Sequence, residues 1–415
     1  MDNVTHALAG LLLAECAVRL RVRHEGMEPS RRFRTVAAVS SLIAANLPDA
    51  DLFYTGVGGD RLGYMLHHRG YSHTVVAALV GAVLVYGVAL VLWRWRAGKA
   101  PPAADSRWLL ALLVVSTLSH IVLDFTNSYG VHPFWPFDDR WYYGDAVFIV
   151  EPWLWVVSVP MLVAASRARL ARVLLSLVLV AGLVLAWRVD LVTIGAATAL
   201  TAGVALFIVL AVVLAPATRV MIALAGWLAV TAVMAAGSAI ARRAVLSAAR
   251  DSDRAVQVLD VVVSPLPGNA VCIQVISLER SGGSYRISTA RVSAAPSIAD
   301  AADCATRSGA GPLFRTSPRA STRAVRWDSE WSAPIGELAT LARESCPVLA
   351  ALRFIRAPIW QSQSSSAVLL GDVRYGGGSG SSFSDVSVPR RASSCPRAVP
   401  PWTPPRAELL ELPTR

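Results

Sequence analysis

The sequence predicts a mostly α-helical protein that crosses a membrane many times and continues into a β-rich domain. Hydrophobic residues make up 54% of the 415 residues and charged residues only 16%, against roughly one quarter charged in a typical soluble domain. Mean hydropathy is +0.49. Long apolar stretches follow one another up to about residue 241, and short alternating runs replace them from about residue 255. A polytopic transmembrane bundle with a C-terminal β-rich domain and a disordered tail accounts for all three observations.

Apolar stretches of roughly 15 to 25 residues are long enough to cross, or nearly cross, the hydrocarbon core of a bilayer. They are Ser72–Trp93, Trp108–Leu123, Ala146–Ala165, Leu170–Trp187, Leu191–Ala215 and Val220–Ala241. The shorter apolar segments Thr5–Leu20 and Val36–Leu47 precede them. We therefore expect a bundle of about eight helices in contact with lipid.

The basic residues predict how this bundle is oriented. The formal net charge is +11, but much of it lies in short loops beside apolar stretches, so topology explains it without a nucleic-acid partner. These loop residues are Arg19, Arg21, Arg23, Arg31, Arg32, Arg34, Arg94, Arg96, Lys99, Arg107, Arg167, Arg169 and Arg172. By the positive-inside rule those loops are cytoplasmic, which places the N-terminus, loops 48–72 and 124–145, and everything after about Arg242 outside. The stretch "MDNVTHALAGLLLAEC" lacks the basic leader of a secretory signal, and we expect it to be retained.

Composition divides the chain into four regions. Residues 1–165 form a membrane-embedded region that carries all seven histidines, and residues 166–245 add further transmembrane helices. Residues 246–375 contain the alternating runs "AVQVLDVVV", "AVCIQVISL" and "SYRISTARV", a helix around Ile335–Phe354 and a late strand at "AVLLGDVRY", which predict an extracytoplasmic β-rich domain. Residues 376–415 are rich in Gly, Ser, Pro and Arg, and we expect them to be disordered.

Four cysteines lie in the region that we expect outside the cytoplasm: Cys272, Cys304, Cys346 and Cys395. An oxidising compartment permits disulfides there, with three pairings open if all four join. Free or partly paired thiols are the alternative. No CxxC spacing indicates a metal site among them.

Polar residues that lipid would not tolerate lie almost entirely at one end of the predicted helices. They are His6, Asp49, Asp51, His67, His68, His73, His120, Asp124, Asp145 and Glu151. The stretch "HHRGYSH", residues 67–73, holds three of the histidines. His120 and Asp124 are four residues apart and share one helix face. Several segments thus deliver imidazoles and carboxylates to the same layer.

Neutral imidazole nitrogens and carboxylate oxygens are the ligands that suit zinc and similar divalent ions. A catalytic ion keeps one position for water and lowers the pKa of that water to about 7, which serves hydrolysis. These imidazoles and carboxylates are more numerous than the ligands that one tetrahedral ion requires. They leave room for second-shell partners, a general base or a second ion.

Ordinary roles explain several of these residues one at a time. His24 and His132 are expected to be interfacial anchors, and His120 with Asp124 could be only a hydrogen-bonded pair. Arg69 could hold a phosphate or carboxylate in a bidentate way, or pair with Asp49 or Asp51. Their shared location, rather than any single pair, favours a metal site.

Ordered motifs in the first 160 residues resemble one bacterial family. They are "MDNVTHALAG", "NLPDAD", "HRGYSH", "SHIVLDFTNSYG", "WPF" and "GDAVFIVEP", and they look like the inner-membrane, predicted metal-dependent hydrolases, some members of which are described as LexA-regulated. The later "SPLPGNAVCIQV" and "LLGDVRYG" resemble the C-terminal part of longer relatives. The resemblance implies a multi-pass hydrolase of the bacterial cytoplasmic (inner) membrane with a divalent metal. The matching polar positions are His6, Asp49, Asp51, His68, His73, His120 and Asp124. In the family's last motif a second aspartate is usual where this chain has Glu151, which puts a ligand role there in doubt.

Together these observations predict a membrane-embedded metallohydrolase with a divalent ion, zinc in the first place. The predicted ligands are His6, Asp49, His68, His73, His120 and Asp124. Asp51 or Glu151 would be the general base, and Arg69 would hold an anionic group of the substrate. The location favours an ester or phosphoester of a lipid-linked or amphiphilic compound.

Two other classes of function compete with this hypothesis. The first is a non-catalytic membrane module in which a metal or polar cluster only fixes the helix ends. The second is a transporter, which would place its coordinating groups near the middle of the bilayer on broken helices. The apolar centres of the predicted helices disfavour a transporter.

Overall fold

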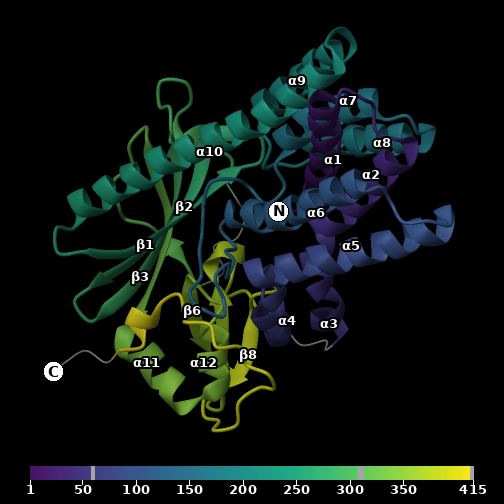
Figure 1. Cartoon of the computed structure of the whole chain (residues 1–415). Coiled ribbons are helices and arrows are strands. Elements are labelled where there is room, and N and C mark those ends of the chain that lie inside the picture. The colour runs from purple at the N-terminus through teal and green to yellow at the C-terminus, as the bar shows by residue number, and fades with distance from the viewer. Residues whose placement is uncertain (58–60, 307–312, 412–415) are drawn as a thin grey trace.

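The computed structural model of the protein describes residues 1–57, 61–306 and 313–411. It is mostly helical, at 55%, with a C-terminal region of antiparallel sheet, as the sequence predicts (Figure 1). The long helices are α1 (Asn3–Glu25), α2 (Arg31–Asn46), α5 (Val75–Ala97), α6 (Ala103–Phe125), α7 (Pro152–Ala165), α8 (Arg169–Ala186), α9 (Ile194–Val213) and α10 (Pro216–Ser252). Each predicted apolar segment corresponds to one of these helices.

Within the described residues, five helices are long and apolar enough to cross a membrane: α5, α6, α8, α9 and α10. Helix α7 is apolar but shorter. Helices α1 and α2 pack on one another and on α6, and they contribute Ala14, Ala17, Val18, Phe33, Ala37 and Ala44 to a shared apolar core. The bundle is therefore built from apolar spans around two less hydrophobic helices that carry part of the polar layer.

Close contact between α1, α2 and α6 fixes the relative positions of their ends. A Cβ atom at Gly10 of α1 would lie only 2.7 Å from the carbonyl oxygen of Ser41 on α2. The Ser41 hydroxyl donates to the Gly10 carbonyl at 2.7 Å and lies 2.7 Å from the Ser116 hydroxyl of α6. Small residues that let helix backbones approach, with hydroxyls bonded across them, are typical of packing in membranes.

Short elements connect α2 to α5 on the side of the bundle where α1 begins and α6 ends. They are the 3-10 helix η1 (Leu47–Asp51), α3 (Leu52–Val57), α4 (Arg61–His67) and the 3-10 helix η2 (Tyr71–His73). Thr74 caps α5 by accepting a hydrogen bond from the nitrogen of Ala77. This connection holds five of the candidate site residues next to the ends of α1 and α6.

The C-terminal region contains two antiparallel sheets. The larger has the order β1-β2-β3-β5-β4 and the smaller the order β6-β7-β8. Their strands are β1 (Gln257–Leu266), β2 (Asn269–Ser281), β3 (Ser284–Ser293), β4 (Arg315–Thr316), β5 (Val325–Pro334), β6 (Pro358–Ser362), β7 (Ala367–Asp372) and β8 (Val386–Pro389). Helices α11 (Ile335–Glu344) and α12 (Cys346–Leu352) join them. The three predicted alternating strands and the late strand are confirmed, whereas the single helix predicted around Ile335–Phe354 is divided into α11 and α12.

Alternation along the strands gives the larger sheet two apolar faces. Val261 and Val263 of β1 pack with Ile273 of β2 against Ala241 and Val245 of α10. Figure 1 shows α10 leaving the helix bundle and crossing this face of the sheet. The opposite face contributes to the largest core of the protein.

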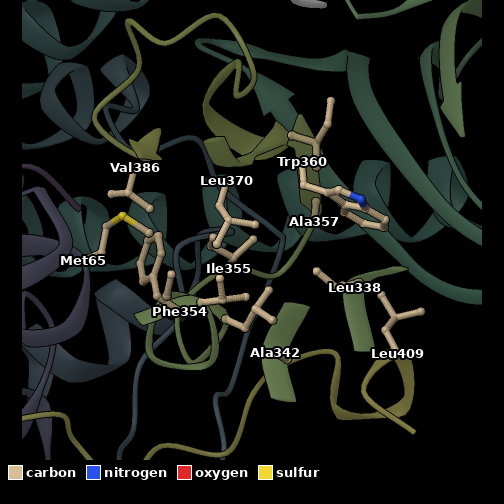
Figure 2. Packing of buried hydrophobic residues seen from close by; sticks show 14 of the residues in the cluster. Met65, Leu338, Ala342, Phe354, Ile355, Ala357, Trp360, Leu370, Val386 and Leu409 are labelled. Atoms are coloured by element: carbon tan, nitrogen blue, oxygen red, sulfur yellow. The ribbon is translucent and has the colours of Figure 1, made fainter. Parts of the chain in front are cut away.

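That largest core joins residues that are far apart in the sequence. Figure 2 shows Met65 of α4 beside Phe354 and Val386, with Leu370 next in the view and Trp360 farther to the right. The C-terminal domain therefore packs directly on the connection that carries the histidine-rich stretch.

The last residues differ from the predicted disordered tail. Residues 386–389 form β8, Cys395 is bonded to Cys346, and the Trp402 side chain is 1% exposed. The few apolar side chains of this segment join a core that other segments have already built, so it needs no core of its own. The second disulfide links Cys272 and Cys304, which settles the pairing that the sequence left open.

Candidate metal centre

Four buried side chains offer ligand atoms that lie within 4.8 Å of one another: Asp49, His73, His120 and Asp124. Asp49 comes from η1, His73 from η2, and the other two from the last turns of α6. The structure thus brings together four of the six predicted ligands from three separate elements.

Five of the six distances between the four ligand atoms lie between 3.1 and 3.5 Å, and the sixth, between Asp49 and Asp124, is at most 4.8 Å. His73 Nε2 lies 3.3 Å from Asp49 Oδ1, 3.2 Å from Asp124 Oδ2 and 3.1 Å from His120 Nε2. His120 Nε2 lies 3.5 Å from Asp49 Oδ1 and 3.2 Å from Asp124 Oδ2. Bonds of about 2.0 to 2.1 Å from a tetrahedral zinc ion to nitrogen and oxygen place the ligands about 3.3 to 3.4 Å apart. The donor set therefore fits such an ion in type and spacing.

Hydrogen bonds on the far side of both imidazoles leave the Nε2 lone pairs directed into the group. His120 Nδ1 lies 2.7 Å from the Ala45 carbonyl oxygen, which can only accept, so Nδ1 carries the hydrogen. His73 Nδ1 lies 3.3 Å from Asp51 Oδ2 and 3.0 Å from the Ser72 hydroxyl. Carbonyl or carboxylate partners of this kind orient the histidine ligands of metal ions.

The Asp124 carboxylate divides its two oxygens between different neighbours. Oδ1 is contacted by His6 Nε2 at 3.2 Å, by the Arg69 guanidinium at 3.0 Å and by the nitrogen of Met1. Oδ2 is buried and accepts no hydrogen bond from any residue that the structure describes. A buried acceptor without a donor costs about 1 to 3 kcal/mol, which a bound cation would offset.

His6 lies against a candidate ligand rather than inside the group of four. Its ring stacks on His120 with a centroid distance of 3.8 Å and an interplanar angle of 15°. Its Nε2 contacts the oxygen of Asp124 that faces away from His73. In this structure His6 holds Asp124 and His120 in place.

A second group of potential ligands adjoins the first and consists of Asp49, Asp51 and His68. Asp49 belongs to both groups. His68 Nδ1 lies 3.0 Å from Asp51 Oδ1, and Asp51 Oδ2 accepts from the Ser72 hydroxyl at 2.9 Å. Asp51 thus contacts both His68 and His73, which suits a residue that orients imidazoles.

Arg69 has a different partner from those that the sequence suggested. Its φ angle is 54°, and its backbone nitrogen donates to Asp51 Oδ2 at 3.0 Å. The buried guanidinium pairs with Asp124, donates to Asn127 Oδ1 at 3.1 Å and lies over the Tyr129 ring at 4.6 Å. Because these contacts engage the guanidinium, the structure favours a role in holding Asp124 over binding of a substrate anion.

Glu151 belongs to neither group of potential ligands within the described residues. It caps α7, accepting from the nitrogen of Trp153 at 3.1 Å, and it accepts from the nitrogen of Gly268 in the β1–β2 turn at 3.2 Å. Burial raises its pKa to about 7 despite these two hydrogen bonds. Its contacts support the joint between α7 and the C-terminal domain rather than the predicted role of general base.

His132 is buried and is not the interfacial anchor that the sequence suggested. It stacks on Trp402 with a centroid distance of 3.9 Å, and its ring centroid lies 3.7 Å from that of Trp141. Its Nδ1 donates to the Arg69 carbonyl at 3.2 Å. The sequence missed the burial of this residue because two of its partners, Arg69 and Trp402, lie far from it along the chain.

Comparison with known proteins places the site in a shared region. Residues 1–193 match the family described as YdjM inner membrane protein. The N-terminal part resembles these inner membrane proteins. The chain is also 25% identical over 158 residues to the uncharacterized protein YfhP of Bacillus subtilis (strain 168). That alignment covers 38% of this chain and 43% of YfhP, so it spans under half of either protein. No solved structure matches the chain.

The matched region contains every candidate ligand and stops before α10 and both sheets. Together with the apolar helices, this match supports a location in the inner membrane. It does not extend to the C-terminal domain, whose role rests on the structure alone.

Proposed function

We propose that this protein is a membrane-bound, metal-dependent hydrolase with Asp49, His73, His120 and Asp124 as its metal ligands. The observation that carries the proposal is that these four donor atoms all lie within 4.8 Å of one another, with both histidines oriented by hydrogen bonds at Nδ1. A divalent ion such as zinc, when bound, polarises a carbonyl or phosphoryl oxygen and lowers the pKa of water to about 7.

The residues around the ligands divide the remaining tasks. Arg69 and His6 hold Asp124, while Asp51 orients His73 and His68. His68, whose side chain is 11% exposed, lies at the accessible edge of the site. There the Asp51–His68 pair acts as the general base, because a carboxylate that fixes an imidazole keeps it aligned for proton transfer.

The substrate approaches from the edge formed by Asp49 and His68. Asp49 is 8% exposed, whereas His73, His120 and Asp124 are fully buried. An edge beside the ends of apolar helices suits an ester or phosphoester that is carried by a lipid or another amphiphile.

The site and the C-terminal domain face the extracytoplasmic side in this proposal. Arg21, Arg32 and Lys99 line a cavity between the ends of α1 and α5 and the starts of α2 and α6, which are the ends opposite the metal site. The positive-inside rule makes that side cytoplasmic. The disulfides Cys272–Cys304 and Cys346–Cys395 agree, because such bonds persist in oxidising compartments.

Metal content tests the ligand set directly. Protein in phosphatidylcholine nanodiscs is loaded with zinc, passed over a desalting column and analysed by mass spectrometry for bound metal. We expect stoichiometric zinc in the wild type and loss of it in His73→Ala and His120→Ala. The exposed His24 supplies the matched control, His24→Ala. Full occupancy in both site variants would exclude the ligand assignment.

Hydrolysis of a panel of nitrophenyl esters and phosphodiesters then tests the reaction. We expect turnover by the zinc-loaded wild type and background rates for both site variants. Reporter fusions after Gly98 and Arg250 test the orientation, and a cytoplasmic signal from the second fusion would contradict it.

The near-complete burial of the ligands favours a second candidate function, a non-catalytic module in which the ion fixes the helix ends. This candidate predicts the same metal content and the same loss in the variants. It differs in predicting no turnover of any ester.

A further inference from the structure

We propose that a cavity in the C-terminal domain binds an uncharged, polyhydroxylated headgroup, such as a sugar, of a lipid-linked substrate. The cavity has a volume of about 420 Å³ and lies between the larger sheet and residues 373–383. This inference rests on the proposed hydrolase function, and it names the class of compound on which that function acts.

The floor of the cavity is the sheet face opposite α10. Ser264 of β1, Gln274 of β2, and Thr289 and Arg291 of β3 line it. Their neighbours in the strands point to the other side, where they pack on α10. Because side chains alternate between the faces of a sheet, the positions of these polar residues along the strands place them all on the face opposite α10.

The charges that line the cavity are already paired. Arg291 Nη2 lies 2.9 Å from Asp328 Oδ1, and its Nη1 donates to the carbonyls of Ala302 and Cys304 at 3.0 and 2.7 Å. Arg374 Nη2 lies 2.8 Å from Asp372 Oδ2. Among the described lining residues, no guanidinium is left without a carboxylate partner, so the cavity is poorly suited to a phosphate.

The uncharged lining residues match a sugar. Ser264 offers a hydroxyl, and Gln274 and Thr289 keep acceptor capacity beside the hydrogen bonds that Gln274 Nε2 donates to the Ala305 carbonyl and that Thr289 Oγ1 shares with the Ser329 hydroxyl. The rings of Tyr375 and Phe383, 4.7 Å apart, form an apolar wall on which the C–H face of a sugar ring can pack. A few polar groups on an apolar wall are typical of small-molecule sites.

A continuous patch of aromatic rings joins this cavity to the accessible edge of the metal site. Phe383 contacts Tyr64 with centroids 5.7 Å apart, and Tyr64 stacks on His68 at 5.1 Å. On the other side Tyr375 lies 5.8 Å from Tyr129, which lies 5.5 Å from His68. A headgroup in the cavity is thereby placed next to the side of the metal site from which substrate approaches.

Binding of simple glycosides tests the proposal apart from catalysis. Methyl glycosides of glucose, galactose and N-acetylglucosamine, and methyl phosphate as a comparison, are titrated against the protein in phosphatidylcholine nanodiscs and followed by saturation-transfer NMR. We expect at least one glycoside to bind and methyl phosphate not to bind in the cavity. Phe383→Ala and Ser264→Leu should each weaken glycoside binding about tenfold or more. Phe134→Ala, a change at another exposed phenylalanine that does not line the cavity, should leave it unchanged.

Nanodiscs that contain a glycosyl diacylglycerol distinguish a lipid headgroup from a free sugar. We expect the glycolipid to compete with the methyl glycoside. Absence of competition, absence of binding by every glycoside, or full binding by both cavity variants would overturn the proposal. Unchanged metal content in Phe383→Ala and Ser264→Leu shows that the variants are folded.

The His120→Ala variant separates this inference from the proposed function. It should bind glycosides like the wild type although it cannot hold the metal. If glycosides bind and the wild-type protein hydrolyses neither a glycolipid nor any ester of the nitrophenyl panel, the hydrolase proposal fails and the cavity stands. If a glycolipid is hydrolysed and no glycoside binds, the cavity proposal fails alone.

Discussion

Asp124 is the residue on which the candidate site depends most. Its carboxylate contacts two histidines through Oδ2, and His6 and Arg69 through Oδ1. The pair with Arg69 is buried on both sides, so removal of one charge leaves the other unpaired in a medium of low dielectric constant.

Replacing Asp124 by Asn should therefore damage both stability and metal binding. Loss of one partner of a buried ion pair costs about 3 to 5 kcal/mol, and we expect zinc affinity to fall by about 100-fold or more. Thermal unfolding and zinc titration in nanodiscs measure the two effects.

Asp105→Asn is the matched control, because Asp105 pairs with Arg21 at the opposite end of the bundle. It should lower stability and leave zinc affinity unchanged. Equal loss of zinc affinity in both variants would show that the effect is a general loss of packing.

Glu151 predicts a pH dependence of stability. Burial raises its pKa from 4.5 to about 7 in the folded protein, so the folded state holds the proton more tightly than the unfolded state. The contribution of Glu151 to the free energy of unfolding is therefore present at acidic pH. It is lost as the pH rises from about 4.5 through 7, by about 3 kcal/mol in all. Unfolding temperatures measured between pH 5 and 8 should therefore fall less steeply in Glu151→Gln than in the wild type. Identical slopes in the two proteins would contradict this assignment.

At the scale of elements, the polar layer forms because several helices end on the same side of the bundle. Close packing of α1, α2 and α6 brings His6 near His120. The short helices η1 and η2 place Asp49 and His73 beside the C-terminal end of α6. Helix α10 then extends beyond the bundle and supports the larger sheet. Helix α10 thus connects the helix bundle that holds the site to the larger sheet of the C-terminal domain.

Gly237 tests how tightly α10 holds the sheet. A Cβ atom there would lie 2.3 Å from the carbonyl oxygen of Ala270 on β2. Because a backbone atom cannot give way cheaply, Gly237→Ala should cost about 1 to 3 kcal/mol of stability, measured as a lower unfolding temperature.

Gly195→Ala in α9 is the control, since a Cβ atom there meets nothing within 4 Å. It should be neutral or stabilise by up to about 1 kcal/mol through helix propensity. A loss of stability of the same size in both variants would refute the close approach at Gly237.

At the scale of the whole molecule, the C-terminal segment completes the surroundings of the metal site. Trp402 stacks on His132 and donates through Nε1 to the Leu66 carbonyl at 3.3 Å. His132 in turn bonds the carbonyl of Arg69, the residue that pairs with Asp124. The end of the chain is thus linked to a candidate ligand through three contacts.

Trp402→Ala should therefore weaken metal binding as well as folding. Removal of this buried ring costs about 3 to 5 kcal/mol, and loss of support for Arg69 should lower zinc affinity about tenfold. Trp95→Ala, at a tryptophan that is 75% exposed, should change neither quantity in nanodiscs. Unchanged zinc affinity in Trp402→Ala would show that the tail stabilises the fold without acting on the site.

The sequence predicts much of the site because its signals are local. His120 and Asp124 share a face by helical periodicity, and the helix ends follow from hydropathy. The pairing of Arg69 with Asp124, the burial of His132 and the ordered tail were not predictable in this way. Each depends on a partner at a great distance along the chain, and neither composition nor spacing specifies which partner that is.

The sequence by itself determined the class of the protein, the positions of its apolar helices and of four of its strands, and the layer in which its imidazoles and carboxylates gather. These follow from hydrophobic periodicity, which acts over a few residues at a time. Only the tertiary structure decided which four donors meet, which groups orient them, how the cysteines pair and where the cavity lies. Those outcomes depend on close packing between distant segments, because a ligand set is made by distances of a few ångströms in space.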